Sequence, residues 1–122
     1  MQPDMNAMVE AARKRVPEIT PEQAAASLKL GNAKLLDVRE ASEWASGRIA
    51  GATHVPVGQI EDAADASLSE WKDEPIIVYC AHGVRSLLAA DSLKSLGFTN
   101  VSSIEGGIVA CQDQGVPIES DE

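Results

Sequence analysis

The feature that most constrains this chain is a short apolar run near its middle. Residues 75–79 read Pro-Ile-Ile-Val-Tyr, without alternation of apolar and polar side chains. A strand with one face in water shows such an alternation, whereas a strand buried on both faces does not. The run therefore predicts a central strand of a parallel sheet, whose strands need helical crossovers between them.

Helix and strand patterns alternate along the rest of the chain. Thr20, Pro21 and Gln23 form a helix start, with an N-cap, a proline at the first helical position and a capping-box partner. The alternation predicts an α/β fold with helices on both faces of a parallel sheet. We expect helices near residues 6–15, 20–30, 39–46, 58–68, 86–96 and 108–113, and strands near residues 34–38, 53–56, 75–79 and 100–104.

Length and charge limit the organisation of the chain and its partners. With 122 residues it has room for one core. We expect a helical N-terminal extension over residues 1–17, one domain over residues 18–118 and a solvated acidic tail over residues 119–122. The net charge of −9 disfavours nucleic acid and anionic membranes. The N-terminal region holds no apolar segment of signal or membrane-spanning length, so we expect a cytoplasmic protein.

The cysteines and histidines do not form a metal-binding pattern. Cys80, Cys111, His54 and His82 are spaced unlike zinc ligands, so we expect neither a metal nor a cofactor. In a reducing compartment both thiols should be free.

Cys80 follows the central strand directly and is the candidate nucleophile. In open α/β sheets, ligands bind at the carboxyl ends of the strands. Gly83 lets the following loop adopt a positive φ, so that successive N–H groups can point at the sulfur. The next helix adds the positive end of its dipole. These donors favour a Cys80 thiolate, and would hold a persulfide there, without a separate general base.

Several segments along the chain, in the family's order, resemble the rhodanese family of sulfurtransferases. Residues 78–86, Val-Tyr-Cys-Ala-His-Gly-Val-Arg-Ser, resemble its active-site loop, in which four residues separate Cys from Arg-Ser. The resemblance covers residues 18–118 and implies a single rhodanese-like domain with a sheet of about five parallel strands. The family's other signatures are resembled by residues 36–40, Glu43-Trp44, residues 47–56, Gly97-Phe98, Val101 and residues 105–108.

The resemblance also implies a ping-pong sulfur transfer. The Cys80 thiolate would take a sulfur from a small anionic donor such as thiosulfate, releasing sulfite. The Cys80 persulfide would then pass this sulfur to cyanide, a thiol or a protein. The groups implied to bind the sulfur or the donor are the loop residues Ala81, His82, Gly83, Val84 and Arg85, together with Arg39.

Several of these residues have a structural alternative. Arg85 could anchor the loop by pairing with an acidic group instead of touching a donor. For Arg39, an ion pair with Glu40 or Glu43 is favoured over a role in catalysis. His82 could tune donor preference, or it could be an exposed loop side chain without a role in the reaction.

Three further positions are expected to be structural. Cys111 stands where the family commonly has Trp, and we expect it to be buried core; the alternative is a second thiol that reacts with Cys80. Arg48 stands where the family often has His. His54, just before Val55, is expected to be a hydrogen-bonded structural residue.

Two other functions compete with sulfur transfer. Phosphatases and arsenate reductases of the same fold place five residues between Cys and Arg to surround a tetrahedral oxyanion. The four residues here, 81–84, form a smaller ring that suits one sulfur atom. A binding or regulatory module that has lost its chemistry typically lacks the cysteine. The donor and acceptor used in the cell and the oligomeric state remain open at this point.

Overall fold

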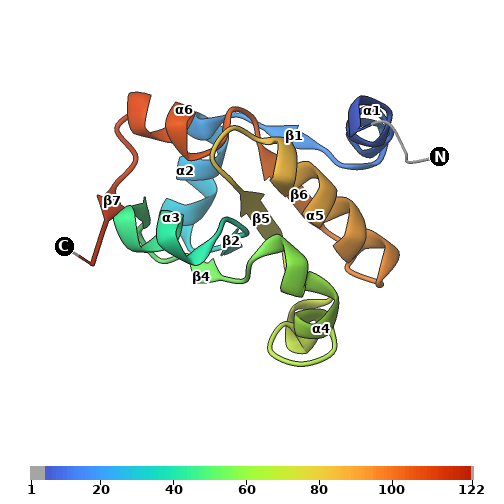
Figure 1. Ribbon diagram of the computed structural model, residues 1–122. Coiled ribbons are helices and arrows are strands. Elements are labelled where there is room, and N and C mark those ends of the chain that lie inside the picture. Colours follow the sequence, from blue (N-terminus) through green and yellow to red (C-terminus); the bar gives the residue numbers. More distant parts are fainter. Residues whose placement is uncertain (1–4, 122) are drawn as a thin grey trace.

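A parallel sheet lies between two layers of helices in the computed structural model, which describes residues 5–121 (Figure 1). Residues 1–4 of the expected N-terminal extension and Glu122 of the expected tail lie outside the described residues. The five strands are all parallel, in the order β1-β6-β5-β2-β4. They span β1 (Glu18–Ile19), β2 (Lys34–Asp37), β4 (Thr53–His54), β5 (Ile76–Tyr79) and β6 (Val101–Ile104). The predicted α/β class and five-stranded sheet are confirmed.

Strand β5 occupies the centre of this sheet, and its four residues are all buried, as the apolar run predicts. Successive side chains of a strand point to opposite faces. Ile76 and Val78 accordingly join one core cluster, whereas Ile77 and Tyr79 join the other. Cys80, the next residue, lies on the same side as Val78.

Helices cover both faces of the sheet. One cluster contains residues of α1 (Met5–Arg15), α4 (Ile60–Ala64) and α5 (Val84–Ser95), and the other contains residues of α2 (Pro21–Leu30) and α6 (Gly107–Asp113). Thr20 caps α2 in the predicted capping box with Gln23. Helix α3 (Ala41–Ser46) follows β2, and two short 3-10 turns span Val57–Gln59 and Ser69–Trp71.

The N-terminal helix α1 packs on α5 of the same domain. Val9, Ala12 and Val16 contribute to the core on that face. The Arg15 guanidinium binds both carboxylate oxygens of Asp91 at 2.7 and 2.6 Å. Residues 5–15 of the expected extension thus form a helix, and this helix is part of the packed domain.

Residues 119–121 of the expected tail are exposed, but they are also held by contacts with the domain. Strand β7 (Ile118–Glu119) pairs antiparallel with β3 (Arg48–Ile49), and the Asp121 carboxylate binds the Arg48 guanidinium at 2.8 Å. The expected domain boundary at residue 118 therefore cuts through a strand. The physical reason is the Arg48 guanidinium, whose side chain is only 14% exposed. It forms ion pairs with the carboxylates of Glu119 and Asp121 at the far end of the chain.

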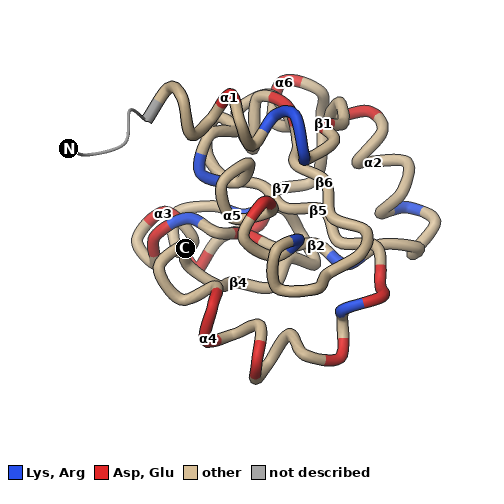
Figure 2. Tube along the Cα trace, turned by 90° about the vertical axis from the view of Figure 1, so that its right-hand side faces the viewer, with Lys and Arg blue, Asp and Glu red and all other residues tan. Residues whose placement is uncertain are grey.

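Acidic residues are frequent in α4 and the neighbouring loops (Figure 2). Within residues 5–121, no helix combines the length and the apolar character needed to cross a membrane.

Candidate active site

Cys80 lies at the carboxyl end of β5 and is only 1% exposed. Helix α5 begins at Val84, so the helix predicted to start near residue 86 starts two residues earlier. This brings its unpaired first-turn N–H groups closer to the sulfur. Gly83 caps the helix with φ of 100°, which confirms the predicted left-handed position. A Cβ at Gly83 would come within 3.2 Å of the Gly106 nitrogen.

Backbone amides converge on the sulfur. The Gly83 N–H donates to Cys80 Sγ at 3.1 Å, and the Ser86 N–H donates to it at 3.4 Å. The Ser86 hydroxyl oxygen lies 3.4 Å from the same sulfur. Gly83 belongs to the set of amides predicted from the sequence, whereas Ser86 lies one residue beyond that set. The resulting ring of donors is suited to a negatively charged sulfur.

The hydroxyl of Ser103 lies behind Ser86, and no pattern in the sequence predicted this contact. The hydroxyl oxygens of Ser86 and Ser103 are 2.7 Å apart, and both residues are fully buried. Ser103 belongs to β6, the strand next to β5. When Ser103 donates to Ser86, the Ser86 proton is free to point at the sulfur. No local motif marks Ser103, because its contact with Ser86 depends on strand pairing.

The start of α6 supports the active-site loop from behind. The N–H groups of Ile108 and Val109 donate to the carbonyl oxygens of Cys80 and Ala81, at 2.9 and 3.2 Å. Gly107, with φ of 62°, lies so close that a Cβ there would be 2.4 Å from both carbonyl oxygens. The glycine thus permits the contact between α6 and the loop.

Arg85 is bound by an acidic side chain, one of the two roles expected for it. Its Nη1 and Nη2 atoms contact the two carboxylate oxygens of Glu43 at 2.7 and 3.0 Å. Hydrogen bonding to Arg85 is the main cause that lowers the pKa of Glu43 to about 2. The pKa of Arg85 is raised, chiefly by this hydrogen bond, and the negative charge of Cys80 adds to the effect.

Arg39 pairs with a different residue from the ones predicted. Its guanidinium binds the buried Asp37 carboxylate at 2.7 Å and the Gly47 carbonyl oxygen at 2.6 Å. The expected partners were Glu40 and Glu43. Strand β2 ends at Asp37, and Arg39 lies two residues further on, so both side chains point to the same side of the chain. The arginine side chain is 6% exposed, and its contact with a donor remains a prediction.

The histidines and Arg48 lie outside the ring of donors. His82 is exposed on the loop. The Nε2 atom of His54 lies 2.7 Å from the Arg39 carbonyl oxygen, and its ring stacks on Trp44 at 4.8 Å. The Arg48 guanidinium lies 4.5 Å from the centre of the Trp44 ring. His54 and Arg48 are therefore structural, as expected.

Cys111 and Cys80 belong to core clusters on opposite faces of the sheet. Cys111 lies in the cluster formed with α2 and α6, whereas Cys80 lies in the cluster on the α5 face. Burial raises the pKa of Cys111 to about 11, which keeps it as a neutral thiol. These positions agree with buried core rather than a resolving thiol.

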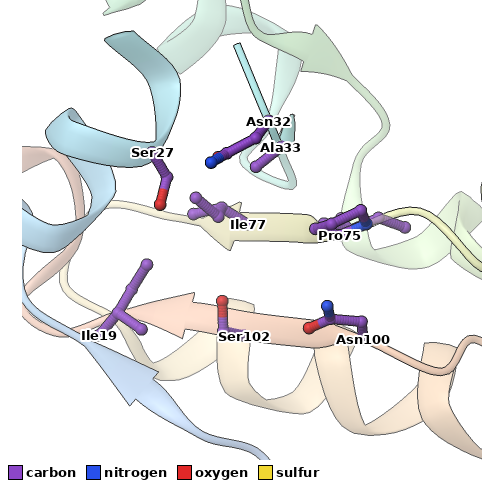
Figure 3. Close-up of a pocket in the computed structure, with 9 residues that line it drawn as sticks. Ile19, Ser27, Asn32, Ala33, Pro75, Ile77, Asn100 and Ser102 are labelled. Carbon is purple, nitrogen blue, oxygen red and sulfur yellow. The ribbon is translucent and has the colours of Figure 1, made fainter. Parts of the chain in front are cut away.

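A hollow of about 440 Å³ adjoins the loop. Its walls come from α3, the loop and α6, and they consist of Arg39, Ser42, Glu43, Ser46, Gly47, Ala81, Ile108, Val109 and Gln112. Another hollow, of about 390 Å³, lies at the other end of the sheet, where Pro75, Asn100 and Ser102 surround the amino ends of β5 and β6 (Figure 3). Ligands of parallel sheets bind at the carboxyl ends, so the hollow beside the loop is the candidate entrance for a substrate.

Known proteins with similar sequences point to one family. A family model described as "Rhodanese-like domain" matches residues 20–114. Thiosulfate sulfurtransferase GlpE of Actinobacillus succinogenes is 39% identical over 106 residues, which cover 84% of this chain and 90% of that protein. The protein of the same name from Pseudomonas entomophila is 42% identical over 90 residues, with coverages of 73% and 78%.

Solved structures give a similar result. A Rhodopseudomonas palustris protein of unknown function, described as a "possible tyrosine phosphatase", superimposes with a TM-score of 0.89 at 31% identity, covering 98% of this chain and 96% of that one. A rhodanese-like domain from Anabaena superimposes with a TM-score of 0.78 at 33% identity, with coverages of 85% and 79%.

Proposed function

This chain belongs to the rhodanese-like domain family, and we propose that it is a thiosulfate sulfurtransferase that carries the transferred sulfur on Cys80. The observation that carries the proposal is the set of donors on one sulfur atom. Gly83 N–H and Ser86 N–H point at Cys80 Sγ, and the Ser86 hydroxyl lies beside it. The sulfurtransferases from Actinobacillus and Pseudomonas support the same activity.

The first half of the reaction loads the enzyme. The Cys80 thiolate attacks the outer sulfur of thiosulfate, an S–S bond to Cys80 forms, and the bond to the sulfite sulfur breaks. Sulfite leaves with the electron pair of the broken bond. The N–H groups of Gly83 and Ser86 stabilise the charge on the sulfur, so the thiolate can react without a separate base.

The second half unloads it. A nucleophilic acceptor, which can be cyanide, a thiol or a protein thiol, attacks the outer sulfur of the Cys80 persulfide. The bond between the two sulfur atoms breaks, and Cys80 leaves as a thiolate. The same donors then stabilise the returning charge, so one ring serves both halves of the reaction.

Incubation with thiosulfate should add the mass of one sulfur atom to the protein. We expect intact-mass spectrometry to show this gain, and peptide mapping to place it on Cys80 and not on Cys111. Addition of cyanide should remove the sulfur and release thiocyanate. Cys111 is the internal control, since it is an equally buried thiol on the other face of the sheet.

An absence of any mass gain with thiosulfate would refute the proposal. A second outcome would favour the phosphatase description attached to the Rhodopseudomonas structure: release of phosphate from an aryl phosphate ester by protein that never forms a persulfide. We expect no such hydrolysis. The ring from Cys80 to Arg85 contains four intervening residues, and its donors already lie 3.1–3.4 Å from a single sulfur.

Ser86→Ala should slow persulfide formation by about tenfold to a hundredfold, the cost of losing one hydrogen bond to a charged group. The amide of residue 86 is kept, so the loss isolates the hydroxyl. Stopped-flow measurement of sulfite release in a single turnover would test this. Ser95→Ala is the matched control, because Ser95 lies on the same helix with its hydroxyl at the exposed end. Equal rates for the two variants would exclude a role for the Ser86 hydroxyl.

A further inference from the structure

Every arginine near the candidate entrance is bound to a carboxylate. Arg39 is held by Asp37 at 2.7 Å, and Arg85 is held by Glu43 at 2.7 and 3.0 Å. These two positive and two negative charges sum to zero. The remaining side chains that line the hollow are uncharged. A small dianion would therefore meet an entrance with no net positive charge, on a chain whose total charge is −9.

Glu43 is fixed in the position from which it neutralises Arg85. Its Oε1 atom also accepts the N–H of Glu40, the residue that caps α3, at 3.0 Å. The carboxylate is thus held by the backbone of its own helix and does not depend on Arg85 for its placement. Its pKa of about 2 means that it stays ionised across the physiological pH range. Glu40 adds a further negative charge that acts on Arg85.

We propose that Glu43 sets the donor preference by neutralising Arg85, so that thiosulfate, a dianion, still loads Cys80 but reacts less efficiently than sulfane donors with one negative charge or none. This inference rests on the proposed sulfur transfer through Cys80. It assigns Glu43 a specificity role in place of a purely structural one. It also makes Arg85 a latent anion site, which becomes available only when Glu43 is removed.

The favoured donor class is an organic sulfane sulfur compound. With a hydropersulfide, R–S–SH, the Cys80 thiolate attacks the outer sulfur, the new S–S bond forms at Cys80, and the organic thiolate R–S⁻ leaves with the bonding electrons. With methanethiosulfonate the leaving group is methanesulfinate. Each step moves one sulfane sulfur and needs no outside oxidant or reductant. The lining of the hollow suits an organic substituent. It offers three uncharged polar side chains, those of Ser42, Ser46 and Gln112, and an apolar wall formed by Ile108 and Val109.

Thiosulfate and methanethiosulfonate form a matched pair of probes, because they undergo the same transfer and carry two and one negative charges. An unpaired guanidinium about 5 Å from a bound donor changes its affinity by roughly tenfold for each charge on the donor. We therefore expect Glu43→Gln to raise the ratio of kcat/KM for thiosulfate to kcat/KM for methanethiosulfonate by about tenfold at low ionic strength. Added salt should reduce this gain, since it screens exposed charges.

The glutamine keeps an oxygen for the Glu40 N–H, so α3 should stay capped. In the Glu43→Gln background, Arg85→Gln should return the donor ratio to its wild-type value. An unchanged ratio in folded Glu43→Gln, or an equal loss with both donors, would overturn the specificity role. Intact-mass spectrometry of the wild-type protein separates the two hypotheses: if thiosulfate does not load Cys80, the proposed function itself fails, whereas loading by thiosulfate with an unchanged ratio in Glu43→Gln refutes only the inference.

Discussion

Replacing Cys80 with serine should lower kcat/KM for sulfur transfer by about 10⁴-fold or more, as expected for loss of a nucleophile. A serine hydroxyl is not ionised at neutral pH and is a poor nucleophile without an adjacent base. The substitution keeps an acceptor for the Gly83 and Ser86 N–H groups, so the loop should hold its shape. Thiocyanate production from thiosulfate and cyanide measures the activity, and thermal unfolding measured in parallel shows that the fold is kept.

The control is the other cysteine of the chain. Cys111→Ala should keep nearly all activity and lose about 1 kcal/mol of stability, because it removes one buried sulfur from the α6 side of the core. If Cys80→Ser kept a tenth of the activity, or if Cys111→Ala lost as much as Cys80→Ser, the nucleophile would have to be reassigned.

The central elements of the fold follow from local sequence patterns. The apolar run of residues 75–79 specifies a strand with two buried faces, and β5 lies in the middle of the sheet. The Thr20 and Gln23 pattern specifies the start of α2, because the capping box is completed within four residues. In both cases the physical cause lies within the segment, so the sequence alone reveals it.

Three of the two-residue strands could not be predicted in this way. Strands β1, β3 and β7 have two residues each, too few to show a period of two. They form because a partner lies beside them. Arg48 and Asp121 are 73 positions apart and meet only after the chain has folded, so the last residues appeared to be a free acidic tail.

The residues of the site show the same difference between local and long-range signals. Cys80, Gly83 and Arg85 lie in one contiguous loop, and the sequence indicated them together. Glu43 reaches Arg85 across 42 positions and Ser103 reaches Ser86 across 17, so neither contact has a local signal. Asp37 and Arg39 are the exception, because their spacing of two along an extended segment could have identified the pair.

Paired charges also explain how a site for negatively charged sulfur exists in an acidic protein. The sulfur is surrounded by N–H donors and a hydroxyl, which carry no net charge, while Arg85 is neutralised by Glu43. Stabilisation of the sulfur thus comes from oriented dipoles, and the ion pair beside it limits the charge of the donor. Dipoles fixed by the backbone lose little energy to reorganisation during the reaction, so the geometry of the loop determines the activity.

Gly107→Ala should therefore have a large effect on both stability and activity. The φ of 62° costs an alanine about 1–2 kcal/mol. Its Cβ would lie 2.4 Å from the carbonyl oxygens of Cys80 and Ala81, which are backbone atoms and cannot rotate away. We expect a total loss of roughly 3–5 kcal/mol, in the range of severe single substitutions. Urea denaturation measures it directly.

The effect on activity follows from the contacts that must be given up to relieve this clash. If α6 moves away, the N–H groups of Ile108 and Val109 release the carbonyl oxygens of Cys80 and Ala81, and the loop loses the support that aims its amides at the sulfur. We expect kcat/KM to fall by about a hundredfold, since misplacement by about 1 Å costs that much.

Gly115→Ala is the matched control: it also has a positive φ, of 76°, but no atom lies within 4 Å of its Cβ. It should lose only the backbone term of about 1–2 kcal/mol and keep its activity. If Gly107→Ala and Gly115→Ala lost the same stability and the same kcat/KM, the close approach of Gly107 to the loop would not contribute to activity.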